Sequence, residues 1–373
     1  MLHPINPPSC VNELLALVDL QKKTLEFAEA NSTYSDVSFK AFVPSEFVDW
    51  LIALRGSTNK GSRKIANRFT QEITDYIKCS QTDKKQILID FILDQEYFSR
   101  IEDSSFMFSL LPAKSIAHEK AKDLLKEFYE LLGEGYPSVL VGLPLNTGLF
   151  LKSSVVSGYV KNNPDVEYVC PCCDSVFTDS ANANEKGYTL EHYFPKSLYP
   201  SICLHPLNLI PMCSGCNSRK GDIDPLEPSV SPAIQVPYAE IFHPISRPVR
   251  TLATLDFKPT TTLIGDMEFF AQNPPPSYEQ SIKAYKIMYQ IPDRWNVNWT
   301  RVDNRVSRCV KRAQQRTIST GIDDQKFDLI LLEAIAELED SFGKDHFSYP
   351  AAKWLAWART NKFQELKNSF LVS

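Results

Sequence analysis

The first third of the chain follows a helical pattern of apolar and polar positions. Apolar side chains recur at intervals of three and four residues in four stretches, residues 11–30, 45–55, 62–79 and 117–135. This period predicts amphipathic helices whose apolar stripes pack into a core. Ser45 stands where a helix cap is expected, and Gly133 and Gly135 follow the last stretch as stop signals. We therefore predict a mostly helical domain over residues 1–160.

The pattern changes after that region. Residues 136–159 are rich in Val, Leu, Gly and Pro, which predicts short strands or an ordered connector. Residues 224–249 are dense in Pro and Ser, and we interpret them as an extended arm on the surface. We assign this arm and the cysteine-rich stretch before it to a second domain, residues 161–260. A C-terminal helical region, residues 261–373, follows.

Composition narrows the class of protein. The 373 residues are 43% hydrophobic, 23% charged and 11% aromatic, as in an ordinary globular protein. The start, MLHPINPPSC, lacks the basic and apolar segments of a signal peptide, and no apolar run reaches the ~18 residues that span a bilayer. We expect a cytoplasmic protein that does not enter a membrane. The formal net charge of -5 gives no global sign of a nucleic-acid partner, although a phosphate-binding surface needs only a local patch.

The cysteines point to a metal. Six of the nine cysteines fall between residues 170 and 216, which favours metal ligation over a disulfide framework. Four of them form two Cys-x-x-Cys pairs, Cys170/Cys173 and Cys213/Cys216. Four thiolates match the tetrahedral ligand set of structural Zn²⁺, which would close a long loop. We interpret Cys172 as a bystander, although exchange with a neighbouring ligand stays open, and Cys203 as a buried thiol.

Acid-base chemistry is predicted inside the loop between the two cysteine pairs. The sequence YTLEHYFPKS predicts a strand, HPLNLIPMC a second strand or turn, and CNSRKGD a helix. His192 is the one residue of the motif whose ordinary pKa lies near neutrality, so it is the candidate general base. Glu191 and Asn217 offer hard oxygen ligands suited to Mg²⁺. His205 lies nearby, either as a participant or in loop packing.

These residues together resemble the HNH endonucleases of the ββα-metal fold. The family pattern appears as Glu191-His192, Pro195, Asn208-Leu209, Cys213-x-x-Cys216-Asn217 and Lys220, over about 55 residues. The resemblance implies an α+β, mainly α-helical protein with a ββα-metal nuclease core, a structural zinc, and flanking helical regions. It also implies hydrolysis of DNA with a catalytic Mg²⁺ or Mn²⁺. In that case His192, Glu191, Asn208 and Asn217 are the catalytic residues, and Asn208 orients the loop and the histidine.

Two features affect the geometry expected of this site. The commoner family residue at position 191 is Asp, and Glu keeps the charge while lengthening the reach. Adjacent residues on a regular strand face opposite ways, so Glu191 and His192 converge on one point only if the strand bends.

The wider pattern EHYFPKSxYP with NLxPxCxxCNxxKGD is similar to the HNH subunits of bacterial anti-phage defence operons. Such subunits are often encoded beside an ATPase. The resemblance therefore implies a role in defence and a partner that is an ATPase or a sensor subunit.

DNA contacts are expected in two places. Near the site they are Lys196, Arg219 and Lys220, of which the last two are placed at the start of a predicted helix. Farther along, residues 300–316 carry six positive charges and one negative charge. Four of the positive side chains share a helical face that either grips the DNA backbone or is merely solvated: Arg308, Lys311, Arg312 and Arg316.

A rival hypothesis is a non-catalytic, zinc-stabilised nucleic-acid-binding module. Such a module has no need for Glu191 beside His192, or for Asn217 directly after the last cysteine. We therefore favour the endonuclease.

Overall fold

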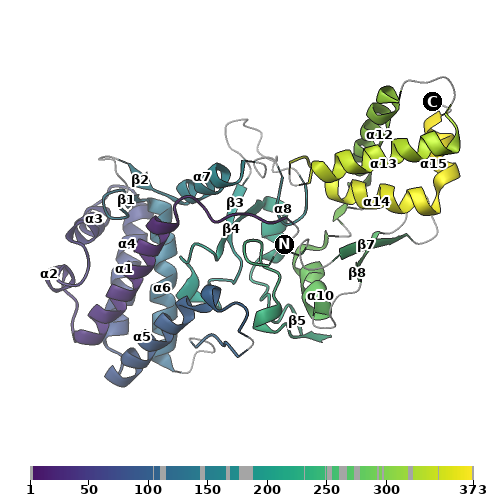
Figure 1. The fold of residues 1–373 in the computed structure, drawn as a ribbon. Coiled ribbons are helices and arrows are strands. Elements are labelled where there is room, and N and C mark those ends of the chain that lie inside the picture. Colours follow the sequence, from purple (N-terminus) through teal and green to yellow (C-terminus); the bar gives the residue numbers. More distant parts are fainter. Residues whose placement is uncertain are drawn as a thin grey trace.

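Helices make up most of the chain, and the strands are short and paired two by two. The computed structural model describes residues 3–103, 105–109, 115–142, 148–164, 169–175, 188–230, 232–247, 249, 254–259, 267–272, 278–291, 294–295, 298–317, 322–342 and 344–371, of which 188, 254–259 and 267–272 are described by their backbone only. Figure 1 shows three parts in a row: N-terminal helices, a central part with short strands, and C-terminal helices. The mainly α-helical α+β class is therefore confirmed.

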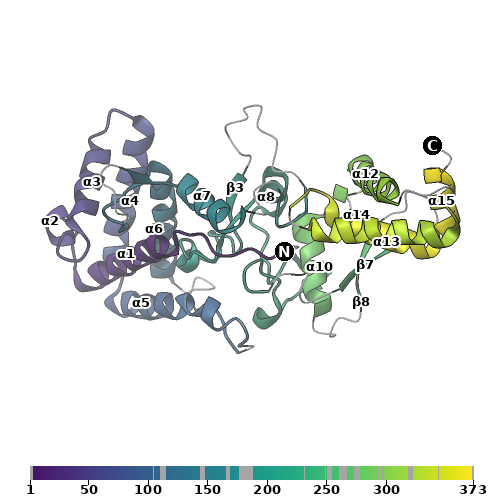
Figure 2. The same ribbon diagram turned by 45° about the horizontal axis from the view of Figure 1, so that its top comes forward.

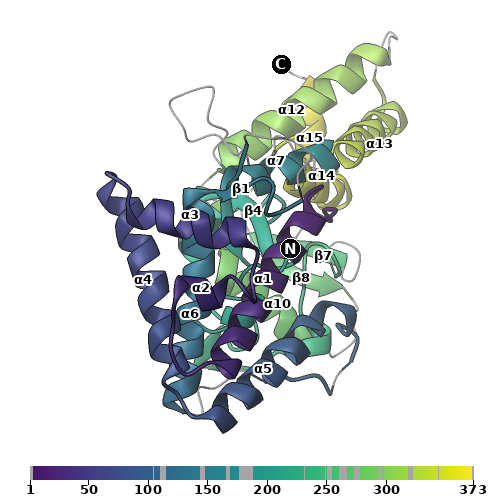
Figure 3. The same ribbon diagram turned by 90° about the vertical axis from the view of Figure 1, so that its left-hand side faces the viewer.

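The N-terminal part is built from long amphipathic helices. They are α1 (Val11–Ala30), α2 (Asp36–Phe39), α3 (Ser45–Arg55), α4 (Lys60–Ile77), α5 (Gln81–Gln95), the 3-10 turn η1 (Tyr97–Ser99) and α6 (Ile116–Glu134). Helix α4 packs on α3 and α6, and α1 packs on α4 and α5 (Figure 3). Buried aromatic rings join these helices: the ring centroid of Phe128 lies 4.9 Å from that of Phe69 and 6.3 Å from that of Phe47. The predicted helices are present because their apolar stripes meet here.

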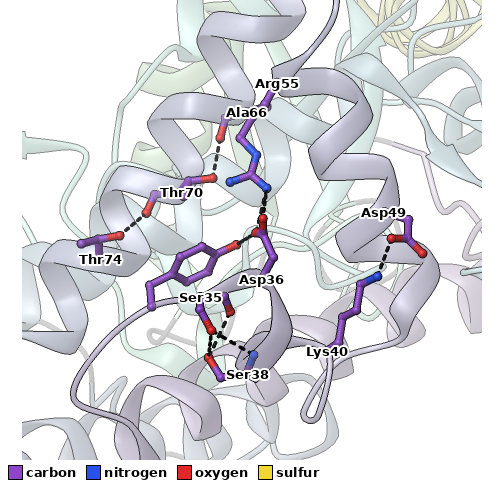
Figure 4. Close-up of polar contacts among 10 residues, drawn as sticks. Ser35, Asp36, Ser38, Lys40, Asp49, Arg55, Ala66, Thr70 and Thr74 are labelled. Atoms are coloured by element: carbon purple, nitrogen blue, oxygen red, sulfur yellow. Dashed lines mark hydrogen bonds and ion pairs between the residues drawn. The ribbon is translucent and has the colours of Figure 1, made fainter.

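The predicted cap at Ser45 is wrong. Ser45 is itself the first residue of α3, and Pro44 stands at the cap position without a side-chain hydrogen bond. Ion pairs join α3 to α2 and the residue after it: Asp36 binds Arg55 at 2.7 Å, and Lys40 binds Asp49 at 2.5 Å (Figure 4). These pairs are partly exposed, so each contributes at most about 1 kcal/mol.

The connector predicted after α6 contains a helix. Strands β1 (Tyr136–Pro137) and β2 (Leu149–Phe150) pair as expected, but α7 (Lys152–Asn162) follows, and residues 143–147 lie outside the described residues. The Val and Gly residues of α7 are poor helix formers, yet burial of Val155 and Tyr159 on one face of this helix overrides that preference. Gly135 ends α6 at φ +82, where a Cβ would meet the Leu149 side chain at 2.9 Å.

The central part has the order strand, strand, helix that the sequence predicts. Strands β3 (Tyr188–His192) and β4 (Leu209–Cys213) pair antiparallel, with Glu191 opposite Ile210 and His192 opposite Leu209. Helix α8 (Ser214–Lys220) begins directly after β4 and packs on both strands. The loop between the strands contains the 3-10 turn η3 (Pro200–Ile202).

The proline-rich arm and the C-terminal part complete the fold. The arm forms the small pair β5 (Ser229–Val230) and β6 (Ala233–Ile234), and then η4 (Tyr238–Glu240). Strands β7 (Thr254–Pro259) and β8 (Met267–Gln272) pair antiparallel, although they lie on either side of the domain boundary predicted at residue 260. Among the described residues the helices that follow are α10 (Tyr278–Tyr289), α12 (Trp299–Arg316), α13 (Asp324–Asp340), α14 (Ser348–Asn361) and α15 (Phe363–Leu371). Figure 2 shows α12 to α15 together. The domain boundaries at 160 and 260 stay predictions.

Within the described ranges, no helix has the length and apolar character needed to cross a membrane.

Candidate metal centre and active site

The two Cys-x-x-Cys pairs meet in a single buried cluster. The Sγ atoms of the four cysteines lie within 4.8 Å of one another: Cys170, Cys173, Cys213 and Cys216. Two of the Sγ pairs, 170 with 216 and 173 with 213, are separated by 3.9 and 3.8 Å. Zn–S bonds of about 2.3 Å place tetrahedral sulfurs about 3.8 Å apart, so the donors fit Zn²⁺. The cluster could therefore hold a zinc ion, with all four positions filled by protein.

The second cysteine pair lies where β4 becomes α8. Cys213 is the last residue of β4 and caps α8, where its Sγ accepts a hydrogen bond from the backbone N–H of Cys216 at 3.4 Å. The backbone N–H of Cys213 in turn donates to Sγ of Cys170 at 3.4 Å. Backbone donors therefore point at the thiolate sulfurs, as expected of a metal ligand set.

C-terminal residues surround the cysteine cluster. The Arg294 guanidinium donates to Sγ of Cys216 at 2.7 Å and to Sγ of Cys213 at 3.4 Å. Trp295 donates from Nε1 to the Cys173 carbonyl at 2.9 Å. Sequence reasoning missed Arg294, which lies 78 positions from Cys216 without any motif of its own.

The two remaining cysteines of the segment are both buried, as predicted for Cys203. Cys172 lies outside the group of four, and its carbonyl accepts a hydrogen bond from the Tyr285 hydroxyl. Sγ of Cys203 donates to the Leu125 carbonyl at 3.3 Å, and burial raises the pKa of this thiol to about 12. Cys203 is therefore an inert core thiol.

His192 is held against the N-terminal part. Its Nε2–H donates to the Cys203 carbonyl at 3.0 Å, and its ring packs edge-on against Tyr129 with 4.3 Å between centroids. Burial lowers its pKa well below the ordinary value, and the positive charges of Lys196 and Lys220 lower it further. The imidazole is therefore neutral at pH 7. Because Nε2 carries the proton, Nδ1 bears the lone pair, and no described residue donates to it.

Glu191 lies on the other face of β3. Pairing is regular through His192, so the two adjacent side chains leave the strand in opposite directions. The Glu191 side chain is 18% exposed, and Oε1 lies 3.7 Å from Nζ of Lys220. Burial raises the pKa of this carboxyl, and the Lys220 charge opposes the shift. Residues three apart share a helix face, so half-buried Asn217 lies on the same side of α8 as Lys220, toward Glu191.

Asn208 is fully buried and fastens the loop between β3 and β4. Its Oδ1 accepts from the Phe194 N–H at 2.8 Å. Its Nδ2 donates to the carbonyls of Phe194 and Ile202 at 3.2 and 3.1 Å. Three bonds from one amide fix the backbone that follows His192 and leads to the Cys203 carbonyl.

Aromatic packing fixes the same loop. The ring of Phe194 lies 5.3 Å from those of Tyr97 and Phe108 and 4.9 Å from that of Tyr199. Tyr159 on α7 donates to the Leu209 carbonyl at 2.5 Å and to that of Pro206 at 3.1 Å. His205 stacks on Phe98 at 4.5 Å, and burial lowers its pKa to about 4. His205 is thus part of the loop packing, away from the described contacts of His192.

The side chains predicted to contact DNA near the site are engaged with protein groups. Lys220 is buried, and its Nζ faces Glu191, so its role as a phosphate contact stays a prediction. Lys196 forms an ion pair with Glu130 and lies 4.7 Å from the Tyr129 ring centroid. Arg219 is exposed and donates to the Gln290 side chain.

The basic face of α12 is partly neutralised. Arg312 and Arg316 both form ion pairs with Glu337 of α13. Arg308 and Lys311 are exposed, and within the described ranges neither makes an ion pair. The positive surface of this helix is therefore smaller than its sequence predicts.

Comparison with known proteins gives one partial likeness. The chain is 39% identical over 53 residues to the Septu protein PtuB of Bacillus thuringiensis. The aligned stretch covers 14% of this chain and 21% of that protein, so the likeness spans about a fifth of the relative. No family model matches the chain, and no solved structure matches it.

Proposed function

We propose that the protein is a metal-dependent HNH endonuclease that hydrolyses DNA phosphodiester bonds and serves as the nuclease of an anti-phage defence system. The observation that carries this proposal is the state of His192. A carbonyl holds its Nε2–H, its pKa is lowered, and Nδ1 is left as the proton acceptor. A buried histidine in this state is suited to general-base chemistry at neutral pH.

The opposite face of the strand supplies the oxygen donors. Glu191 supplies a carboxylate, which accepts from the His192 backbone N–H and lies 3.7 Å from Nζ of Lys220, and Asn217 adds an amide oxygen. Two protein oxygens suit Mg²⁺ or Mn²⁺, which keep several positions for water and phosphate oxygens. A bound divalent ion supplies positive charge to the phosphate and to the leaving oxygen.

Glu191 and His192 leave β3 in opposite directions, so they act on one phosphate only if β3 bends at His192 when DNA and metal bind. In in-line displacement the attacking water and the leaving oxygen lie on opposite sides of the phosphorus atom. His192 would take a proton from the attacking water at Nδ1, and Glu191 and Asn217 would hold the ion beside the leaving oxygen. Asn208 holds the loop that leads from His192 to the Cys203 carbonyl.

The likeness to PtuB supports the role in defence, together with the pattern around Glu191 and His192. It also supports a partner from the same defence system, an ATPase or a sensor subunit. The proposed DNA contacts are Lys196, Arg219, Arg308 and Lys311. Lys220 contributes if it exchanges Glu191 for phosphate, and Arg312 and Arg316 contribute if they exchange Glu337 for phosphate.

The alternative is a zinc-stabilised module that binds nucleic acid without cutting it. It accounts for the cysteine cluster, but it gives no reason for the hydrogen bond that fixes the tautomer of His192. We therefore place catalysis first.

The test is cleavage of supercoiled plasmid by the purified zinc-loaded protein with Mg²⁺ or Mn²⁺. We expect the wild type to nick or linearise the plasmid and His192→Ala to lose at least about 100-fold in rate, the effect of removing a general base. His346→Ala is the matched control, because His346 is an exposed histidine in the C-terminal part. Absence of cutting with every divalent ion, or equal cutting by His192→Ala, would refute the nuclease.

A further inference from the structure

Lys152 is a cation beside the candidate active site that forms no ion pair with a described residue. It is the first residue of α7, and its Nζ lies 4.0 Å from the centroid of the Tyr129 ring. The side chain is partly buried, which lowers its pKa. In the part of the chain that the structure describes, this ammonium makes no hydrogen bond or ion pair. Its Nζ lies on a ring face and beside the last turn of α6, 3.6 Å from where a Cβ on Gly133 would stand. A half-buried ammonium that has lost water and keeps unused donors is suited to binding an anion.

Tyr129 connects this lysine to the site. The same ring contacts the His192 ring, and the Tyr129 hydroxyl donates to the Leu190 carbonyl on β3 at 3.3 Å. The Tyr129 ring is therefore attached to the strand that carries His192, and Lys152 packs on this ring. Consistent with this proximity, the charge of Lys152 is among the causes that lower the pKa of His192, after burial and two other lysines.

A second lysine shares the ring. Nζ of Lys196 lies 4.7 Å from the Tyr129 centroid and is paired with Glu130. Glu130 is a carboxylate that acts on Lys152, and it is already bonded to Lys196. Glu191 also acts on Tyr129, but it faces Lys220. Among these described residues three ammonium groups therefore face two carboxylates, which leaves a net positive charge around the ring.

We propose that Lys152, with Lys196 over the Tyr129 ring, forms a binding site for a phosphate of the nucleic-acid backbone next to His192. The proposal rests on the proposed function for its place in cleavage. Lys152 lies outside the stretch that resembles HNH nucleases, so the N-terminal part of the chain supplies a substrate contact in addition to support. A phosphate fits because it brings the negative charge that Lys152 lacks and accepts hydrogen bonds from both ammonium groups.

The binding test uses the full zinc-loaded chain in the His192→Ala background, with Ca²⁺ and a labelled 20-base-pair duplex. Its Kd is measured between about 50 and 200 mM salt. Each lost phosphate contact reduces the slope of log K against log salt by about one. We expect Lys152→Met to lower the slope by about one and to weaken binding about tenfold near 100 mM salt. Lys152→Arg should keep the slope, because it keeps the charge.

Lys161→Met is the matched control, since Lys161 is an exposed lysine on the same helix. Zinc content and circular dichroism check the fold, and Lys152→Gln replaces Lys152→Met if the latter misfolds. An unchanged slope and Kd in a folded Lys152 variant overturns the phosphate site.

Cleavage with an intact His192 separates the two proposals. We expect Lys152→Met to cut plasmid at least about tenfold more slowly than the wild type. If the wild type does not cut but its binding slope depends on Lys152, the nuclease fails and the phosphate site stands. If the wild type cuts and Lys152→Met cuts equally fast with an unchanged slope, the phosphate site fails and the nuclease stands.

Discussion

Arg294 offers a quantitative test of the cysteine cluster. Four thiolates around Zn²⁺ carry a net charge of about −2, and the cluster is buried. The Arg294 guanidinium donates to two of the sulfurs, at 2.7 Å and 3.4 Å, and is the group that offsets this charge from outside the ligand set. It also packs against α8, where its Nη2 lies 2.9 Å from the position that a Cβ on Gly215 would occupy.

Arg294→Met keeps much of the side-chain length and removes the charge and both donors. Loss of a partner outside the ligand set typically weakens metal binding by about 10- to 100-fold, equivalent to about 1.4–2.7 kcal/mol. Two charge-assisted hydrogen bonds set a larger upper bound, about 3–6 kcal/mol. We expect the smaller range, because Arg294 is only half-buried and water can replace part of the interaction.

The assay is competition for zinc between the protein and a colorimetric chelator, followed to equilibrium. Arg301→Met is the control, because Arg301 is an exposed arginine of the same C-terminal part and touches none of the four sulfurs. Equal zinc affinity of Arg294→Met and the wild type would show that the guanidinium does not stabilise the bound ion.

Three further predictions concern stability, each measured by urea unfolding of the zinc-loaded protein. Asn208→Ala should lower the free energy of unfolding by about 2–4 kcal/mol, because three buried backbone groups lose their partner. The control Asn361→Ala changes an exposed asparagine and should alter stability little, and equal losses in the two variants contradict this role of Asn208. Tyr159→Phe should lower the free energy of unfolding by about 1–3 kcal/mol, because the Pro206 and Leu209 carbonyls stay buried without their donor. A loss under 0.5 kcal/mol, roughly the effect of a surface change, counts against this role of the Tyr159 hydroxyl. Burial lowers the pKa of His205 to about 4 in the folded protein, below its value of about 6.5 in the unfolded chain. As the pH falls from about 6.5 to 4, the unfolded chain therefore binds a proton that the folded protein does not, and the free energy of unfolding decreases. Between pH 7 and 5 that loss is about 2 kcal/mol, and His205→Phe, which keeps the stacking on Phe98, should remove it; identical pH profiles refute the assignment.

The features that the sequence predicts are those encoded locally. The helices of the N-terminal part follow from a strong three- and four-residue period, because each buried stripe lies on one helix. The cysteine cluster follows from two three-residue spacings, each of which sets both sulfurs on one turn. The strands and helix around His192 follow from their apolar runs and the stops between them.

The features that it does not predict depend on distant partners. Helix α7 has poor local propensity and forms because Tyr159 is buried against the β3–β4 loop, 47 and 50 residues further along. Lys220 has the sequence context of a phosphate contact, but the fold turns it inward toward Glu191. Arg312 and Arg316 form a basic face along one helix, and only the neighbouring α13 reveals the carboxylate that binds both.

The central segment depends on its surroundings for the geometry of both sites. It contains two five-residue strands and one seven-residue helix, too little to bury a core of its own without a metal. The C-terminal part completes the metal side, where Arg294 and Trp295 bond to the cysteines or their backbone. The N-terminal part completes the histidine side, where Tyr129 packs on His192. A change that loosens either contact therefore shifts one reactive group relative to the other. The cleavage proposed above should accordingly depend on how the two helical parts are held around the segment, and a proposed partner that binds either part would have a direct physical route to the site.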